Sequence, residues 1–356
     1  MRKIHGKNRF EKRLEHLSPD ILVRIAQIDE LKGRWIAGAR LSPQILGRLK
    51  KSVLVTSTGA STRIEGASLS DQDIEKLMRG LSVQKFTNRD KQEVRGYYEL
   101  LQNVFESWQT IPFSEGSIKH FHKELLKYVE KDKLHRGDYK KRENKVEMVS
   151  NEGKTLATIF DPTPAYLTPK EMQDLMEWTR SALTEGAFHP LLVIGNFLVE
   201  FLAIHPFQDG NGRMSRILTN LLMLRAGYLH VPYVSHEKFV EDNKSDYDIA
   251  LRRSQKSFKT REENIHPWLS FFLGVILNQS KMAVDLLSPD ALDKLLSGKQ
   301  LLVWTYIQSV KEASPRDIVR ATHVARPTVN QVLNKLQALK KIEPLGQGRA
   351  TRYRKL

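Results

Sequence analysis

The sequence predicts a mainly α-helical fold with one inserted β-hairpin and a winged helix-turn-helix at the C-terminal end. Three observations lead to this prediction. Apolar residues recur at helical spacing along most of the 356 residues. Before the C-terminal tail, only residues 144–167 show two strands separated by a turn. Residues 299–356 follow the order helix, helix, helix, strand, strand.

The composition is that of an ordinary globular protein, with 40% hydrophobic and 28% charged residues. The length suggests two or three domains. The absence of cysteine excludes disulfides, thiolate zinc sites and cysteine nucleophiles. The longest apolar run, Leu191 to Ile204, contains Asn196 and Glu200 and is too short to cross a bilayer. No secretory signal follows the basic N-terminus, so we expect a cytoplasmic protein without a membrane partner.

Helices are expected along the first half of the chain. Residues 1–40 are helix-compatible, and Ser42-Pro43 begins a second helix as N-cap and first residue. Thr56 to Gly59 is expected to interrupt that helix, leaving residues 61–66 as a short helical turn. Caps and apolar spacing predict further helices over residues 70–81, 88–109 and 117–128.

Residues 145–160 form the predicted hairpin, with Asn151 and Gly153 supplying the turn. A two-stranded ribbon is marginal alone, so it is not expected in the core. It either covers a site as a flap or is a surface loop.

The central predicted element is a helix over residues 190–204, which is apolar on every face and therefore buried. A helix over residues 168–178 precedes it. A polar, glycine-rich loop follows it. The remaining helices are expected over residues 213–227, 237–258 and 265–287.

The tail is strongly basic. The whole chain has a net charge of +16, and residues 299–356 contain twelve Lys or Arg against three acids. With a boundary near Ser288-Pro289, this favours a nucleic-acid-binding module. Gln331 and Asn334 are placed to face base edges. Candidate phosphate contacts are Lys335, Lys340, Lys341, Arg349, Arg352 and Arg354. A module for protein contacts or dimerisation is the alternative.

The stretch from His205 to Arg216 contains the candidate catalytic and phosphate-binding residues. His205 ends a rigid helix and can act as a general base. Asp209 is a hard oxygen ligand suited to Mg²⁺. Gly210 and Gly212 let backbone amides approach an anion at a helix N-terminus, where Asn211 adds a neutral donor. Arg213 and Arg216 share one helix face. Together these residues describe a polyphosphate site beside a nucleophile that must be deprotonated.

These residues resemble the signature of the Fic family, His-x-Phe-x-Asp/Glu-Gly-Asn-Gly-Arg-x-x-Arg, without departure. The resemblance extends over most of residues 50–285. It implies an all-helical enzyme with a hairpin flap that transfers AMP from ATP to a Ser, Thr or Tyr hydroxyl of a target protein or of itself, releasing pyrophosphate. Together with the order of helices and strands in the tail, it leads us to expect three regions: residues 1–110 as an N-terminal helical region, 111–288 as the catalytic core and 289–356 as the winged-helix domain.

The resemblance assigns roles within the site. His205 would deprotonate the hydroxyl, and Asp209 would hold Mg²⁺. Gly210, Asn211 and Gly212 would cradle the phosphates with help from Arg213, and Arg216 would grip the γ-phosphate. Phe207 would anchor the loop in the core. The flap would align the target by strand addition.

A second pattern resembles the family's inhibitory helix, Ser/Thr-x-x-x-Glu-Gly/Asn. It falls on residues 61–66, with Ser61, Glu65 and Gly66 at the defining positions. The resemblance implies that Glu65 pairs with Arg216. An arginine held by a carboxylate cannot also receive the γ-phosphate, so ATP would bind unproductively.

Several alternatives stay open. The chain could be a DNA-binding regulator whose Fic domain senses a nucleotide, a scaffold with a vestigial site, or an enzyme that also removes AMP with water positioned by Glu65. Another nucleotide or a phosphocholine donor could replace ATP. Tyr247 could pack against the base or ribose, or belong to the core. A homodimer is also open.

Overall fold

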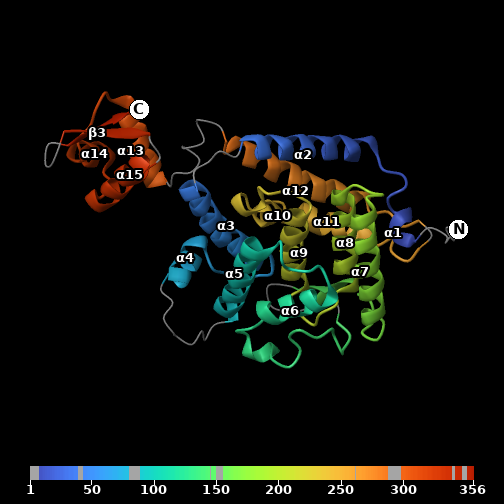
Figure 1. Ribbon diagram of the computed structural model, residues 1–356. Coiled ribbons are helices and arrows are strands. Elements are labelled where there is room, and N and C mark those ends of the chain that lie inside the picture. Colours follow the sequence, from blue (N-terminus) through green and yellow to red (C-terminus); the bar gives the residue numbers. More distant parts are fainter. Residues whose placement is uncertain are drawn as a thin grey trace. The chain divides into compact units, whose positions relative to one another are not determined.

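The computed structural model describes residues 8–38, 43–79, 89–144, 146–149, 155–260, 262–287, 298–338, 341–346 and 351–356. These ranges contain fifteen α-helices and two antiparallel sheets of two strands each, so the mainly α-helical prediction is confirmed (Figure 1). The chain divides into two compact units, Met1–Gly38 with Lys50–Ala283 and Ala39–Leu49 with Val284–Leu356. The predicted boundary near Ser288 lies outside the described residues.

Helices build almost all of the first unit. In chain order they are α1 (Arg9–Lys12), α2 (Pro19–Gly38), α3 (Pro43–Ile64, whose first residues belong to the second unit), α4 (Asp71–Arg79), α5 (Arg89–Ser107), α6 (Glu115–Leu125), a 3₁₀ turn (Glu130–Asp132), α7 (Thr168–Glu185), α8 (Pro190–Ile204), α9 (Asn211–Arg225), a second 3₁₀ turn (Val231–Tyr233), α10 (His236–Asp242), α11 (Lys244–Gln255) and α12 (His266–Asp285).

Helix α8 is the centre of the first unit, as its apolar composition predicts. Every residue after Pro190 is buried, and the helix contacts both α7 and α9 (Figure 1). Burial of a helix on all sides removes large apolar side chains such as Phe197 and Phe201 from water, each contributing about 1.5–3 kcal/mol. The result is a rigid support that ends at the loop beginning with His205.

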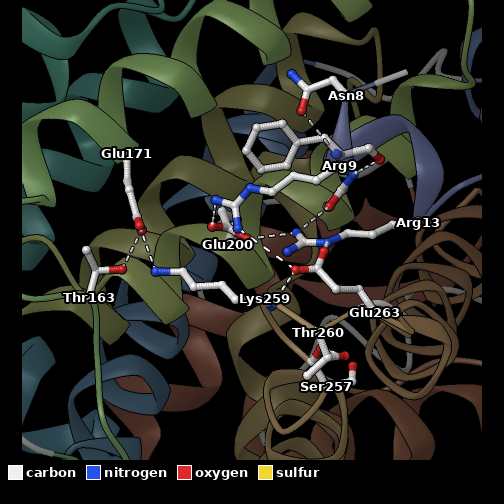
Figure 2. Close-up of polar contacts among 12 residues, drawn as sticks. Asn8, Arg9, Arg13, Thr163, Glu171, Glu200, Ser257, Lys259, Thr260 and Glu263 are labelled. Atoms are coloured by element: carbon white, nitrogen blue, oxygen red, sulfur yellow. Dashed lines mark hydrogen bonds and ion pairs between the residues drawn. The ribbon is translucent and has the colours of Figure 1, made fainter. Parts of the chain in front are cut away.

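Glu200, the charged residue inside α8, belongs to a cluster of ion pairs that Figure 2 shows. Arg13, which follows α1, donates from Nη1 to Glu200 Oε2 at 2.7 Å and from Nε to Glu263. Arg9 pairs with the other oxygen of Glu200 at 2.5 Å. A buried carboxylate is tolerated only when it is paired and hydrogen-bonded. The cluster therefore ties the N-terminal residues to α8 and to the segment before α12.

The expected interruption at Thr56–Gly59 is wrong, because α3 runs unbroken through these residues. Ser57 is buried, and its hydroxyl donates to Glu237 Oε2 at 2.7 Å. Gly59 leaves room for the side chains of Asp71 and Arg63, which a Cβ at this position would meet at 2.4 and 2.5 Å. Tertiary contacts of these small residues outweigh their low helix propensity.

Other boundaries shift by a few residues. Helix α7 continues past Trp178 to Glu185 and ends at Gly186, whose φ of 66° is left-handed. Helix α9 begins at Asn211 rather than Arg213, and the helix expected over residues 237–258 divides into α10 and α11 around Asn243.

The hairpin consists of β1 (Val146–Val149) and β2 (Thr155–Phe160), which pair antiparallel with two register shifts. The predicted turn at Asn151 and Gly153 lies outside the described residues. None of the helices in the described ranges combines enough length with enough apolar character to span a bilayer.

The second unit contains α13 (Gly298–Ser309), α14 (Pro315–Thr322) and α15 (Arg326–Ala338), followed by β3 (Ile342–Leu345) and β4 (Arg352–Lys355). The two strands pair antiparallel. Its own apolar core includes Trp304, Ile318 and Leu333. Helix α14 begins with a capping box between Ser314 and Asp317, which satisfies two otherwise unpaired backbone amides.

Candidate active site

The loop between α8 and α9 has a fixed backbone. His205 and Gly210 both adopt left-handed conformations, with φ of 51° and 81°. The side chain of Asn211 bridges the loop, accepting from the Phe207 amide at 2.9 Å and donating to its carbonyl at 2.8 Å. Phe207 is fully buried and stacks on His122 with ring centroids 3.9 Å apart. Its side chain therefore fastens the loop to the core, as expected for an anchor.

The tautomer of His205 follows from its contact with α8. Nδ1 lies 3.4 Å from the carbonyl oxygen of Leu202. A carbonyl can only accept, so Nδ1 carries the proton and Nε2 keeps a free lone pair. Burial lowers the pKa of His205 to about 4. The imidazole is therefore neutral at pH 7, the state that a general base requires.

Asp209 lies within a network of arginines. Its Oδ1 accepts from the Gly210 amide at 2.6 Å and from Arg213 Nη2 at 3.2 Å. Its Oδ2 pairs with Arg89 at 2.6 Å. Glu93 pairs with both arginines, at 2.7 and 2.8 Å. Burial alone would raise the pKa of Asp209, but the charge of Arg213 and the Gly210 amide bring it below its ordinary value. The carboxylate is thus ionised.

A single carboxylate suits Mg²⁺ here. Mg²⁺ in phosphate sites is commonly held by one or two carboxylates together with substrate phosphates. Asp209 is 36% exposed and can provide one such ligand if Arg89 yields Oδ2. No cluster of three His, Asp or Glu side chains suited to a metal occurs in the described part of the chain. Any ion bound at this loop would therefore depend on the phosphates for most of its ligands.

Arg216 is held by the end of α3. Its Nε donates to Ser61 Oγ at 2.7 Å, and its Nη2 donates to the Ser61 carbonyl at 2.9 Å and to Glu65 Oε1 at 2.6 Å. Although burial opposes ionisation, the charge of Arg216 lowers the pKa of Glu65. Gly66, with φ of 100°, turns the chain after Glu65. The structure thus brings Ser61 and Glu65 next to Arg216, although about 150 residues of the sequence separate them from it.

Glu65 also lies against the N-terminus of α9. A Cβ at Gly212 would come within 2.2 Å of Glu65 Oε1 and 3.3 Å of Arg216 Nη1. That Nη1 is buried and has no hydrogen-bond partner among the described residues. Arg216 Nη1, the N-terminus of α9 and the open space at Gly212 together form a site that stabilises an anion. The carboxylate of Glu65 occupies part of that anion site.

Tyr247 lies in the core. It is buried and packs edge-to-face against Trp268 and Phe271, with centroids 5.8 and 5.7 Å away. Tyr247 and Arg216 line a cavity of about 30 Å³, which has space for a water molecule. Burial raises the pKa of Tyr247 to about 12, so its hydroxyl stays protonated.

Four residues of the site were not predicted from the sequence: Arg89, Glu93, His122 and Lys140. His122 Nε2 lies 3.0 Å from the Asp209 carbonyl, and the Gly137 amide donates to His122 Nδ1 at 2.8 Å. His122 therefore positions the loop, with its pKa lowered to about 4 by burial. Since all four lie in ordinary charged segments, no local pattern marks them.

Comparisons with known proteins show what this region of the chain is similar to. Residues 112–223 match the model of the Fic/DOC family. Over these residues, about a third of the chain, it is similar to the Fic/DOC family.

Curated relatives match only in part. A protein of Aquifex aeolicus named probable protein adenylyltransferase is 35% identical over 81 residues, 23% of this chain and 24% of that protein. Protein adenylyltransferase Fic of Drosophila willistoni is 42% identical over 57 residues, 16% of this chain and 11% of that protein. The matches span a quarter or less of these relatives.

Solved structures share the fold more widely. A Fic family protein from Desulfovibrio desulfuricans G20 superposes with a TM-score of 0.64 and 25% identity, covering 96% of this chain and 97% of its own. Residues 134–508 of Fic-1 from C. elegans superpose with a TM-score of 0.57 and 18% identity, covering 74% of this chain and 72% of that one.

Proposed function

We propose that this protein is an adenylyltransferase that moves AMP from ATP to a hydroxyl side chain of a protein, on itself or on a target bound at the flap. The proposal depends on one observation: the loop between α8 and α9 and the first turns of α9 carry a neutral His205, Asp209 and the buried Arg216, whose Nη1 has no hydrogen-bond partner among the described residues. The names of the partial relatives point to the same reaction.

In the proposed reaction, His205 Nε2 removes the proton from the attacking hydroxyl. The hydroxyl oxygen forms a bond to the α-phosphorus of ATP, and the bond from that phosphorus to the bridging oxygen of the β-phosphate breaks. Pyrophosphate carries away the electron pair. The amides of Gly210, Asn211 and Gly212 would stabilise charge on the phosphates, as would Arg213 and Arg216. Mg²⁺, when bound at Asp209, supplies neutralisation of phosphate charge.

Regulation is part of the proposal. Glu65 would restrain the enzyme by holding Arg216 away from the γ-phosphate, and any activating event would have to move the end of α3. The same carboxylate could instead orient a water molecule for removal of AMP. Release of AMP from labelled protein in the absence of ATP would identify that reverse reaction.

The test is transfer of label from ATP with Mg²⁺. In the Glu65→Gly variant, α-labelled ATP should label protein and γ-labelled ATP should not. Adding His205→Ala should abolish labelling while ATP binding persists, because a positioned base contributes about 10²–10⁴-fold. Labelling that survives His205→Ala would remove the base from the mechanism. Labelling from GTP or a phosphocholine donor alone would replace ATP as the substrate.

We also propose that the second unit is a winged helix-turn-helix that binds DNA. Helix α15 buries Val329 and Leu333, while its other side exposes Asn330, Gln331 and Asn334. Of the expected phosphate contacts, Arg352 pairs with Glu312, Arg354 with Glu343, and Lys335 donates to Gln300. Lys340 and Arg349 lie outside the described residues. The exposed arginines of α14 and α15 are Arg316, Arg320 and Arg326.

Salt dependence distinguishes this second proposal from a protein-contact module. Binding of the full chain to duplex DNA should weaken steeply with added salt, because each phosphate contact releases counterions. The double variant Arg320→Glu with Arg326→Glu should reduce the salt slope, and Lys170→Glu in the first unit serves as the control. Binding that ignores salt, or no binding at low salt, would refute the DNA proposal.

A further inference from the structure

The segment from Gly137 to Asn144, just before β1, runs along the loop that carries His205. The backbone amide of Lys140 donates to the Pro206 carbonyl at 2.8 Å, and its Nζ donates to the Ile204 carbonyl at 3.1 Å. Asn144 Nδ2 donates to the Phe207 carbonyl at 3.0 Å. This one segment therefore holds carbonyls on both sides of His205.

Those carbonyls need partners for a physical reason. The last carbonyls of a helix have no intrahelical donor, and Ile204 is the last residue of α8. His205 leaves the helix with φ of 51° and ψ of 61°, a region that non-glycine residues seldom adopt. Lys140 is only 4% exposed, so its ammonium lies within the protein at the negative end of α8.

The charge of Lys140 is balanced by few neighbours. Asn144 Oδ1 accepts from Nζ at 2.8 Å. Burial lowers the pKa of Lys140 to about 8, Glu143 and Glu171 oppose that shift, and Lys259 adds to it. Figure 2 shows Lys259 paired with Glu171, at 2.6 Å. Lys140 therefore stays mostly protonated at pH 7.

The surroundings of His205 include three charged groups. Lys140 lowers its pKa, whereas Glu65 at the end of α3 and Asp209 in the loop raise it. Lys140 is thus the cation that both contacts the backbone around His205 and favours its neutral form.

We propose that Lys140 is a positioning residue, which acts through the carbonyls of Ile204 and Pro206 to hold the His205 ring in the orientation that leaves Nε2 free. Its role in the reaction rests on the proposed function, but its effect on the ring does not. Since Lys140 and Asn144 lie within six residues of the first residue of β1, the same contacts connect the segment that leads into the hairpin to the backbone around His205.

The test measures the tautomer and the pKa of the His205 ring directly. Long-range ¹H–¹⁵N NMR spectra of the full chain, with the His205 signals assigned by their loss in His205→Asn, report tautomer and pKa. In Lys140→Met, the single Nδ1–H tautomer should become a mixture, and the pKa of His205 should rise by about 0.5–1 unit. Lys140→Arg should restore the wild-type spectrum. The control is Lys141→Met, since the Lys141 side chain is 79% exposed and should leave the ring unchanged.

The wild type provides a test that does not depend on the folding of a variant. Deprotonation of Lys140 near pH 8 should shift the His205 nitrogen signals, although His205 itself is already neutral. A flat response across this range, or an unchanged ring in folded Lys140→Met, overturns the proposal.

Kinetics separate the two proposals. In a Glu65→Gly background, Lys140→Met should lower kcat about tenfold to a hundredfold with the KM for ATP within about twofold, because a misplaced base affects the chemical step. An unchanged kcat overturns the positioning role in the reaction. If no variant transfers AMP but the ring responds as described, the proposed function fails and the structural role of Lys140 stands.

Discussion

Replacement of Glu65 by glutamine isolates the charge of the contact between Glu65 and Arg216, which we propose to be inhibitory. The amide has the shape of the carboxylate, so α3 should keep its conformation and Arg216 should keep both contacts with Ser61. Only the charge-assisted bond from Arg216 Nη2 to Glu65 Oε1, 2.6 Å long, is weakened. If ATP must displace this bond to bind productively, its loss should activate the enzyme.

The magnitude follows from the contact and its exposure. A hydrogen bond to a charged group contributes about 1.5–3 kcal/mol. The Glu65 side chain is 36% exposed, so solvent screening places the contribution at the low end, about 1.5 kcal/mol. Since 1.4 kcal/mol corresponds to a factor of ten, Glu65→Gln should raise the initial rate of AMP transfer about tenfold.

The assay is the initial rate of incorporation of α-labelled ATP at subsaturating ATP, with Glu177→Gln on the exposed side of α7 as the matched control. Isothermal titration should show that Glu65→Gln still binds ATP. A rate at or below that of the wild type, with ATP binding intact, would refute the reasoning that Arg216 is the contested group.

Three further predictions concern other parts of the first unit. Because burial lowers the pKa of His205 to about 4, transfer rates in Glu65→Gln should stay level from about pH 7.5 to 5.5 and fall only as His205 becomes protonated near its pKa; a loss of rate centred near pH 6.5 in stopped assays would contradict this. Arg89→Ala should lower the Mg²⁺ concentration for half-maximal transfer by about 1.4-fold to fivefold, since an exposed ion pair with Asp209 contributes about 0.2–1 kcal/mol; a metal titration of the rate checks it. Gly96→Ala should destabilise the protein by about 1–3 kcal/mol or more in urea unfolding, because a Cβ there would lie 2.0 Å from the Leu125 carbonyl oxygen, whereas Gly33→Ala, with open space around it, should not.

The parts of the site that lie together in the sequence could be predicted from it. Between His205 and Arg216, the histidine, the carboxylate, the two glycines and the two arginines each have a recognisable use in a phosphate site. A buried helix on one side and a new helix on the other fix their relative positions. The pattern at residues 61–66 was informative only through its resemblance to a known inhibitory motif, because nothing local shows that Glu65 will lie beside Arg216.

The remaining site residues could not be predicted because their partners are far away in the sequence. Arg89 contacts Asp209 across 120 residues, and Lys140 contacts Ile204 across 64. Both lie in segments where lysine and arginine are common, so a functional charge looks like any surface charge. Glu200 was visible as an interruption of an apolar run, but its partner Arg13 lies 187 residues away.

The sequence predicts helices well where apolar periodicity determines their position. It predicts them less well where polar contacts between distant residues determine whether a helix continues. Helix α8 is buried because no other arrangement covers its apolar faces. The continuity of α3 depends instead on Ser57 donating to the buried carboxylate of Glu237, which also accepts from Tyr97 and Asn220. Helix propensity predicts that Ser, Thr and Gly interrupt a helix, because it takes no account of a distant acceptor such as Glu237.

The proposed inhibitory contact and the proposed phosphate site depend on the same physical features, so few changes can affect one without the other. Arg216 binds Glu65 at the N-terminus of α9, and the absence of a side chain at Gly212 leaves room for the carboxylate. The same two features would also stabilise a phosphate. Any change that weakens Arg216 or fills that space must therefore weaken inhibition and ATP binding together. A change on α3 weakens inhibition alone. If Glu65 inhibits the enzyme as proposed, a physiological activator would have to act on α3 or on its contacts. These include the ion pair of Arg63 with Glu241 and the bond from Lys244 Nζ to the Ile64 carbonyl.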